Sequence, residues 1–541
     1  MQALYQLSYS PVLFVLRVPP ATPHTLHGSG GRLPNAFLVR PSAPRYCRPV
    51  TATPSRTFPA RARGLTAGRV RAALRRRPVP AAAALCLLSF AGLWAAQRAA
   101  EVSMIDLMVY RAEGWTVRTG GDLYAMRATH AELPATYPPF AALLFVPLTW
   151  VGTGTMRTVA TAGNLALLVA LVHLSLRLLD RAGPSGELRG PARPAAVLLV
   201  SALAVWCEPV WTTLRYGQVN LLLAVLVLWD LTRRPGHRWA GAGIGLAAGI
   251  KLTPGLFALF LALVGIVHAV RAARGPGGAA GPDGTTARGG PSGRGPRLWN
   301  PWLRAAATAA ACFTATVLVA VLALPADSRR FWTEAVFAAG RVGFAEDTAN
   351  QSLRGVLARA LHTGDPGAWW AVTAAVVAAC GLAVAVGAAA AGPALPHGHA
   401  WAVVTAAVTA LLVSPVSWSH HWVWGVPLVL LLGREAARRR SRAWWAGAGA
   451  AGLVFCSFGI WLVPHGEGRL ELHQGAGEAA LSALYPAVGA AFLLLATAVL
   501  RRAVARTGTA GRDGVPAPDA RPSPLGRTPS AASAPDDGSA G

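Results

Sequence analysis

Residues 239–270 read WAGAGIGLAAGIKLTPGLFALFLALVGIVHAV. This apolar run is too long for one straight transmembrane helix, which needs roughly 20 residues. Lys251 and Pro254 interrupt the run, and Lys251 is the one lysine of the chain. We therefore expect two membrane helices that meet at a polar break.

The composition of the whole chain agrees with a membrane protein. Its 541 residues are 53% hydrophobic and 13% charged, which is more apolar surface than a soluble core of this length buries. The net charge of +27 comes from short arginine clusters between the apolar runs and in the tails, and no basic stripe alternates with aromatic residues. The pattern indicates cytoplasmic loops and argues against a nucleic-acid partner.

The six cysteines stand singly, mostly inside apolar runs, and no pair has the spacing of a metal or redox motif. We interpret them as small hydrophobic residues. No nucleotide-phosphate loop, dinucleotide fingerprint or metal motif occurs, so the sequence predicts neither a cofactor nor a metal.

The predicted fold class is an all-α polytopic membrane protein with roughly twelve transmembrane helices and with helices in the extracytoplasmic loops. Several runs are shorter than one span, and we expect these to pair as hairpins or broken helices. The apolar runs cover residues 81–99, 156–179, 195–213, 219–232, 239–270, 303–324, 368–391, 400–417, 421–433, 443–463 and 481–500.

The segments outside these runs suggest three parts. Residues 1–75 are predicted to be a disordered cytoplasmic extension, and residues 76–505 a multi-span membrane domain. Within that domain, 271–300 is expected to be a flexible cytoplasmic insertion, and 506–541 a disordered cytoplasmic tail.

Arginine clusters after alternate runs set the orientation. By the positive-inside rule they lie in the cytoplasm, so we expect a multi-pass plasma membrane protein with both termini inside. The candidate chemical residues then gather outside, in segments 100–137, 214–220, 250–254, 325–367, 414–422 and 464–480.

The first outside segment holds a candidate base. On a helix, Asp106, Tyr110 and Glu113 share one face, and apolar residues share another. We expect a helix on the membrane surface with its carboxylates towards a cavity, where Asp106 can accept a proton from a hydroxyl. A solvated surface acid is the alternative.

The Lys251-Leu-Thr253-Pro254 break is a candidate anion site. Thr253 is expected to be the N-cap and Pro254 the first residue of a helix whose free N–H groups point outwards beside the lysine charge. A lysine that only reaches for the outer headgroups is the alternative.

Further outside segments supply amides, guanidinium groups and imidazoles. For the segment 214–220 the alternative is ordinary helix capping. For the histidines of the segment 414–422 the alternative is anchoring at the membrane interface. Adjacent histidines on a helix point about 100° apart, which disfavours a metal. The residues are Arg215, Gln218 and Asn220, then Asn350, Gln351 and Arg354, and finally His420 and His421.

Together these motifs resemble glycosyltransferase family 87, the polyprenol-phosphate-mannose-dependent mannosyltransferases with the GT-C fold. The matching pieces lie in one order between residues 100 and 425. They are Asp106-Leu-Met-Val-Tyr110, Tyr137-Pro-Pro, Gly217-Gln-Val-Asn220, Lys251-Leu-Thr-Pro254, Asn350-Gln-Ser-Leu353 and Ser414-Pro-Val-Ser-Trp-Ser-His-His421.

The resemblance implies an inverting, metal-independent transfer of mannose from a polyprenyl-phosphate-mannose donor to a hydroxyl of a cell-envelope glycolipid or glycan, giving an α-mannoside outside the cytoplasm. Asp106 would be the catalytic base. Lys251, Arg215, Arg354 and His421 are the candidates for the donor phosphate. The candidates for sugar or acceptor are Tyr110, Gln218, Asn220, Asn350, Gln351 and His420.

A secondary transporter or lipid-linked-sugar flippase is the alternative from another class. Such proteins also use broken helices, but they often contain an internal repeat and place their polar groups near the midplane. This sequence has no evident repeat, and its motifs fall at one surface.

Overall fold

The computed structural model describes residues 77–180, 192–234, 236–274 and 299–510. These residues form helices and contain no β-strand, apart from two isolated bridges. The all-α prediction is confirmed. The predicted extension 1–75 lies outside the described residues, as do 275–298 of the insertion and 511–541 of the tail, while helix continues to Ala273 and to Ala510.

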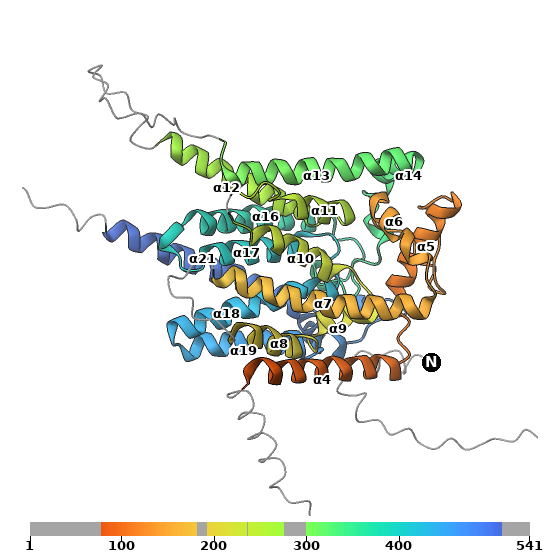
Figure 1. Cartoon of the computed structure of the whole chain (residues 1–541), viewed down its shortest axis with the longest axis horizontal. Coiled ribbons are helices and arrows are strands. Elements are labelled where there is room, and N and C mark those ends of the chain that lie inside the picture. Colours follow the sequence, from red (N-terminus) through yellow and green to blue (C-terminus); the bar gives the residue numbers. More distant parts are fainter. Residues whose placement is uncertain (1–76, 181–191, 235, 275–298, 511–541) are drawn as a thin grey trace, which may run out of the picture.

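The helices follow one another along the chain as labelled in Figure 1. They are α4 (Pro78–Ala99), α5 (Ile105–Thr119), α6 (Pro139–Phe145), α7 (Thr153–Asp180), α8 (Ala192–Ala204), α9 (Glu208–Tyr216), α10 (Asn220–Leu231), α11 (Ala242–Ile250), α12 (Gly255–Ala273), α13 (Pro301–Ala323), α14 (Pro325–Arg330), α15 (Leu353–Ala360), α16 (Gly367–Ala390), α17 (Gly398–Val413), α18 (Gly425–Arg439), α19 (Arg442–Cys456), α20 (Ala476–Leu481) and α21 (Leu484–Ala510).

Within the described ranges, six helices are long and apolar enough to cross a membrane, namely α4, α7, α12, α13, α16 and α21. The pair α8 and α9 makes a seventh span if its 75° bend is counted as one broken helix. Shorter apolar helices such as α10 and α17 lie beside them. The chain is therefore an integral membrane protein, and the count of about twelve crossings stays a prediction.

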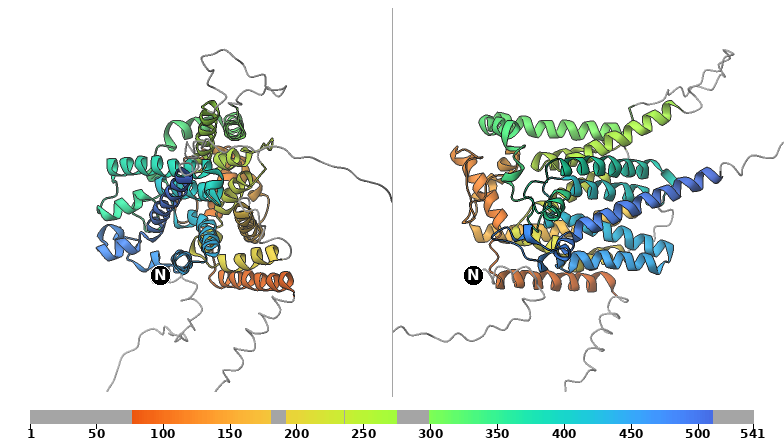
Figure 2. Two further views of the ribbon diagram at one scale, coloured as in Figure 1. Left: turned by 90° about the vertical axis from the view of Figure 1, so that its left-hand side faces the viewer. Right: turned by 180° about the vertical axis from the view of Figure 1, so that it is seen from behind.

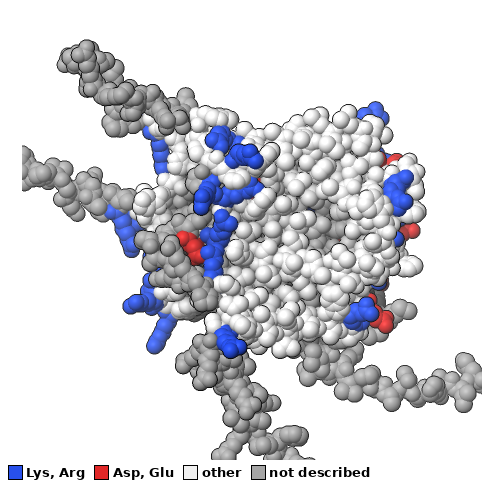
Figure 3. Space-filling model, in the orientation of Figure 1, with Lys and Arg blue, Asp and Glu red and all other residues white. Residues whose placement is uncertain are grey.

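The long helices run side by side through the molecule, and the two ends of the bundle differ (Figures 1 and 2). Helices α5, α6 and α14 lie at one end. The opposite end holds the C-terminal ends of α12 and α21 and the turn between α18 and α19. Figure 3 shows mainly Lys and Arg at this second end, and a wide uncharged band between the two ends.

The break at Lys251 is present as predicted, but the N-cap of the second helix lies one residue later than expected. Helix α11 ends at Ile250, Lys251 is extended, and α12 begins at Gly255 with Pro254 as its N-cap. The predicted N-cap, Thr253, makes no capping bond. Glycines hold α11 close to α13, because a Cβ at Gly249 would collide with Thr316.

Two cysteines that are far apart in the sequence lie in contact. The sulfur atoms of Cys207 and Cys456 lie 2.9 Å apart although the residues are 249 positions apart. Both are free cysteines, and the packing of α9 against α19 brings them together.

Candidate active site

A cavity of about 610 Å³ opens at the end of the bundle that carries α5 and α6. Its walls come from α5, from the break between α11 and α12, from the loop after α14 and from the segment after α17. The polar side chains in these walls are Asp106, Tyr110, Thr136, Tyr137, Gln218, Lys251, Thr253, Arg341, Ser414, Trp418 and His421.

Asp106, the second residue of α5, is held by Gln218. Nε2 of Gln218 donates to Oδ2 of Asp106 over 2.7 Å. The amide cannot turn over freely, because its Oε1 accepts hydrogen bonds from the hydroxyls of Tyr110 (2.7 Å) and Tyr137 (3.1 Å). No described residue donates to Oδ1 of Asp106, so this oxygen can receive a proton.

The surroundings of Asp106 shift the pKa of its carboxyl group. Burial raises the pKa of its carboxyl to about 6, while the Gln218 hydrogen bond and the positive charge of Lys251 act in the opposite direction. Asp106 is therefore ionised at neutral pH. Burial raises the pKa of Glu113 to about 8. Glu113 is buried on the same helix but does not line the cavity, so only one of the two carboxylates faces it as expected.

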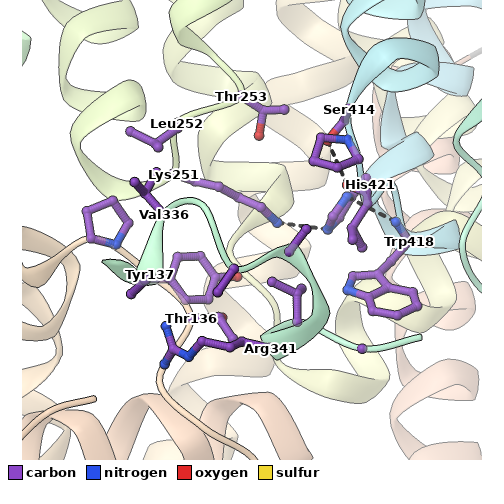
Figure 4. Close-up of a pocket in the computed structure, with 18 of the residues that line it drawn as sticks. Thr136, Tyr137, Lys251, Leu252, Thr253, Val336, Arg341, Ser414, Trp418 and His421 are labelled. Carbon is purple, nitrogen blue, oxygen red and sulfur yellow. Dashed lines mark hydrogen bonds between the residues drawn. The ribbon is translucent and has the colours of Figure 1, made fainter. Parts of the chain in front are cut away.

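Lys251 and His421 meet in the same cavity wall. Nζ of Lys251 lies 2.8 Å from Nε2 of His421 and 3.4 Å from Oδ1 of Asn220. Nδ1 of His421 accepts a hydrogen bond from the backbone N–H of Trp418, which fixes the ring and turns Nε2 to the lysine (Figure 4). The three polar side chains make a site for an anion.

Two predicted phosphate ligands do not reach the cavity. Arg354 lies beside Asp365 at 3.7 Å and over the ring of Trp370. Arg215, near the end of α9, is not part of the cavity wall. The prediction that these two arginines bind the donor phosphate is not supported, because neither side chain lines the cavity.

Four predicted sugar or acceptor ligands are also absent from the wall, namely Asn220, Asn350, Gln351 and His420. Asn220 lines a smaller neighbouring hollow, where its Oδ1 contacts Lys251. Asn350 and Gln351 are completely buried, and their amides bond to the backbone of Ala345, Thr348, Ser417 and Ser482. His420 is buried against Tyr216. Asn350 and Gln351 instead tie the segment before α15 to the segment that carries His421, so they position the site and do not line it.

Sequence reasoning missed Arg341 and Glu208. Arg341 lines the cavity from a short turn after α14, nine residues before the Asn350 motif and outside it. The buried carboxylate of Glu208 accepts hydrogen bonds from Thr212, Ser419, Trp461 and Tyr485. This Glu208 cluster joins α9, α21 and the turn that carries His421. In the sequence, Glu208 is simply an acid that precedes a proline, and this pattern does not indicate a buried hydrogen-bond acceptor.

In the part of the chain that the structure describes, no three His, Cys, Asp or Glu side chains lie close enough together to hold a metal ion. The metal-independent reaction stays a prediction.

Long apolar helices carry a cavity lined by one carboxylate, a lysine and a histidine, an arrangement suited to a membrane-embedded transferase that acts on an anionic lipid-linked substrate. The chain belongs to glycosyltransferase family 87, whose model matches residues 135–281 and 298–415. The matched residues include Gln218, Lys251 and Arg341, whereas Asp106 and His421 fall outside them. The predicted family is confirmed, and the protein is a membrane glycosyltransferase.

The chain is similar to curated mannosyltransferases. It is 32% identical over 369 residues to the polyprenol-phosphate-mannose-dependent alpha-(1-2)-phosphatidylinositol pentamannoside mannosyltransferase of Mycobacterium tuberculosis (strain CDC 1551 / Oshkosh), covering 67% of this chain and 73% of that one. It is 32% identical to the corresponding phosphatidylinositol mannoside mannosyltransferase of Mycolicibacterium smegmatis, covering 65% and 74%.

Among solved structures, the chain is similar to ArnT from Cupriavidus metallidurans bound to undecaprenyl phosphate. The sequence identity is 13%, the TM-score is 0.34, and 80% of this chain and 78% of that one are covered. A likeness of this degree carries no further conclusion.

Proposed function

We propose that this glycosyltransferase transfers mannose from polyprenyl-phosphate-mannose to a hydroxyl of a cell-envelope glycolipid of the phosphatidylinositol mannoside type, and that it forms an α-mannoside. The observation that supports this most strongly is one cavity that joins Asp106 to the Lys251–His421 pair. The names of the similar mannosyltransferases support the donor and the acceptor class.

The donor phosphate binds at Lys251, His421 and Asn220. Nζ of Lys251 lies 2.8 Å from Nε2 of His421 and 3.4 Å from Oδ1 of Asn220. Helix α12 begins four residues after the lysine, with the free N–H groups of its first turn. A helix N-terminus and a cation stabilise the negative charge that grows on the phosphate as it leaves.

The acceptor hydroxyl attacks C1 of the mannose from the face opposite the phosphate. Its proton passes to Oδ1 of Asp106, and the bond between C1 and the phosphate oxygen breaks with its electron pair left on the phosphate. Because attack and departure occur on opposite faces, a β-linked donor gives an α-mannoside. Gln218 holds the carboxylate for this step.

A small hollow next to the phosphate site offers a path for the prenyl chain. It measures about 60 Å³, shares Lys251 and His421 with the cavity, and has apolar walls from α10, α12 and α17. The carbon atoms next to the donor phosphate enter between Leu223, Val227, Phe257 and Leu411. Burial of these apolar groups holds the donor without involving the reacting atoms.

The active site lies on the extracytoplasmic side, and both termini lie in the cytoplasm. The arginine clusters support this orientation, because they gather at the end of the bundle opposite to α5 and α6 (Figure 3). They include Arg271 and Arg274 of the α12 end, Arg438, Arg439, Arg440 and Arg442 around the turn between α18 and α19, and Arg501, Arg502 and Arg506 of α21.

The test is a transfer assay with purified protein in detergent, where no gradient exists. Radiolabelled polyprenyl-phosphate-mannose is incubated with phosphatidylinositol mannosides, and GDP-mannose replaces the lipid donor in a parallel reaction. We expect label in the acceptor lipid from the polyprenyl donor only. Transfer from GDP-mannose alone, or no transfer from either donor, would refute the proposal.

A further inference from the structure

We propose that Arg341 forms a second anion site in the catalytic cavity, which binds the phosphodiester of an anionic lipid acceptor and so selects that acceptor. The inference rests on the proposed function and names a residue that determines its specificity.

Arg341 ends the short helical turn Ala339–Arg341 in the loop after α14. Its side chain lines the same cavity as Asp106 and Lys251. Figure 4 shows it beside Thr136 and Tyr137, while Lys251 extends towards His421. The cavity therefore has a cation outside the proposed donor phosphate site.

The guanidinium is fixed in place but its charge is not neutralised. Nη2 donates to the backbone oxygen of Ala135 over 2.7 Å, and Cζ lies 5.2 Å above the ring of Tyr124. Among the described residues no carboxylate lies within ion-pair distance of Arg341. Other arginines of these outer loops do pair, as Arg330 does with Asp122 at 2.6 Å and Arg469 with Glu346.

The surroundings of Arg341 favour an anion. Burial lowers the pKa of its guanidinium, the nearby positive charges of Arg127 and Arg330 lower it further, and Tyr124 opposes them. A cation in such a place gains when a negative group binds next to it. The proposed donor has one phosphate, which the Lys251–His421 pair already holds, so the second negative group has to come from the acceptor.

The same loop is suited to an amphiphilic partner. The side chains of Phe337 and Phe344, on either side of Arg341, are 78% and 65% exposed. Exposed aromatic side chains next to a cation are typical of a surface that meets lipid headgroups. An acceptor with acyl chains and a phosphodiester matches this arrangement, and the relatives are named for phosphatidylinositol-based acceptors.

The experiment compares two acceptors with saturating polyprenyl-phosphate-mannose. One is a phosphatidylinositol mannoside, and the other is a mannosyl diacylglycerol that lacks the phosphodiester. The variants are Arg341→Met and Arg341→Lys, and the matched control is Arg329→Met, which removes an exposed cation of the preceding helix α14 outside the cavity.

We expect Arg341→Met to raise KM for the phosphodiester acceptor about tenfold or more, with KM for the donor and for the neutral acceptor unchanged. Arg341→Lys should restore part of the loss, and Arg329→Met should resemble the wild type. An unchanged KM, an equal rise for both acceptors, or a rise in the donor KM would overturn the inference. A wild-type protein that transfers mannose to neither acceptor would instead refute the proposed function.

Discussion

Nε2 of Gln218 donates a hydrogen bond to Oδ2 of Asp106 over 2.7 Å, across 112 positions of the sequence. Two tyrosine hydroxyls hold the other end of the amide, so the donor nitrogen has to face the carboxylate. The carboxylate is thereby oriented before a substrate binds, and its second oxygen is the one that the proposed mechanism assigns to the incoming hydroxyl. The first two predictions follow from this contact.

The rate of mannose transfer should fall as the pH is lowered into the acidic range. Because the raised pKa of Asp106 is about 6, the carboxylate accepts a proton below this value and can no longer remove one from the acceptor. We expect kcat/KM to fall about tenfold per pH unit below about pH 6. A rate that stays constant or rises towards acid, while thermal unfolding shows intact protein, would contradict the role of Asp106.

Gln218→Leu should move the acid limb of this profile to higher pH. The substitution removes a hydrogen bond that favours the ionised carboxylate, so the pKa of Asp106 rises further. The matched control is Glu113→Gln, a change at the second buried carboxyl of α5, which should leave the midpoint where it is. A midpoint that moves to lower pH in Gln218→Leu would show that the amide does not act on Asp106.

Lys251→Met should weaken donor binding. Methionine keeps much of the length of the side chain but removes the charge beside His421, and we expect a loss of about tenfold to a hundredfold in affinity for polyprenyl-phosphate-mannose. Arg354→Met removes a cation outside the cavity and serves as the control. Equal losses in the two variants, measured by binding of labelled donor, would remove Lys251 from the phosphate site.

Glu208→Ala should destabilise the protein. Four buried or half-buried donors, on Thr212, Ser419, Trp461 and Tyr485, lose their acceptor at once. Each such loss costs about 1–3 kcal/mol, and we expect Tm in detergent to fall by about 5 °C or more. The control is Glu334→Ala at an exposed carboxylate. A Tm equal to that of the wild type would mean that the Glu208 cluster does not hold the fold together.

Much of the fold could be predicted because membrane helices have a strong local signal. The apolar run at 239–270 and the lysine within it were enough to predict the break between α11 and α12. The lengths of the shorter helices were harder, since α10 has 12 residues and α17 has 16, and packing decides where they end. The contact between Cys207 and Cys456 depends on tertiary structure alone.

The site was predictable where a residue type is unusual in its setting. A single lysine in an apolar run and an acid at the start of a loop helix both stand out, and both line the cavity. Arg354 and Asn350 also stood out, but their side chains bond elsewhere, which only coordinates reveal. Arg341 stood in a loop with many arginines, so its sequence setting gave no reason to choose it.

The most direct test of the account is mannose transfer by Asp106→Asn, with the anomeric configuration of the wild-type product determined by NMR. The substitution keeps the shape of the side chain and removes its basicity. We predict an α-mannoside from the wild type, and a rate about a hundredfold to ten-thousandfold lower for Asp106→Asn with donor binding intact. Transfer by Asp106→Asn at the wild-type rate, or a β-mannoside as product, would contradict the account.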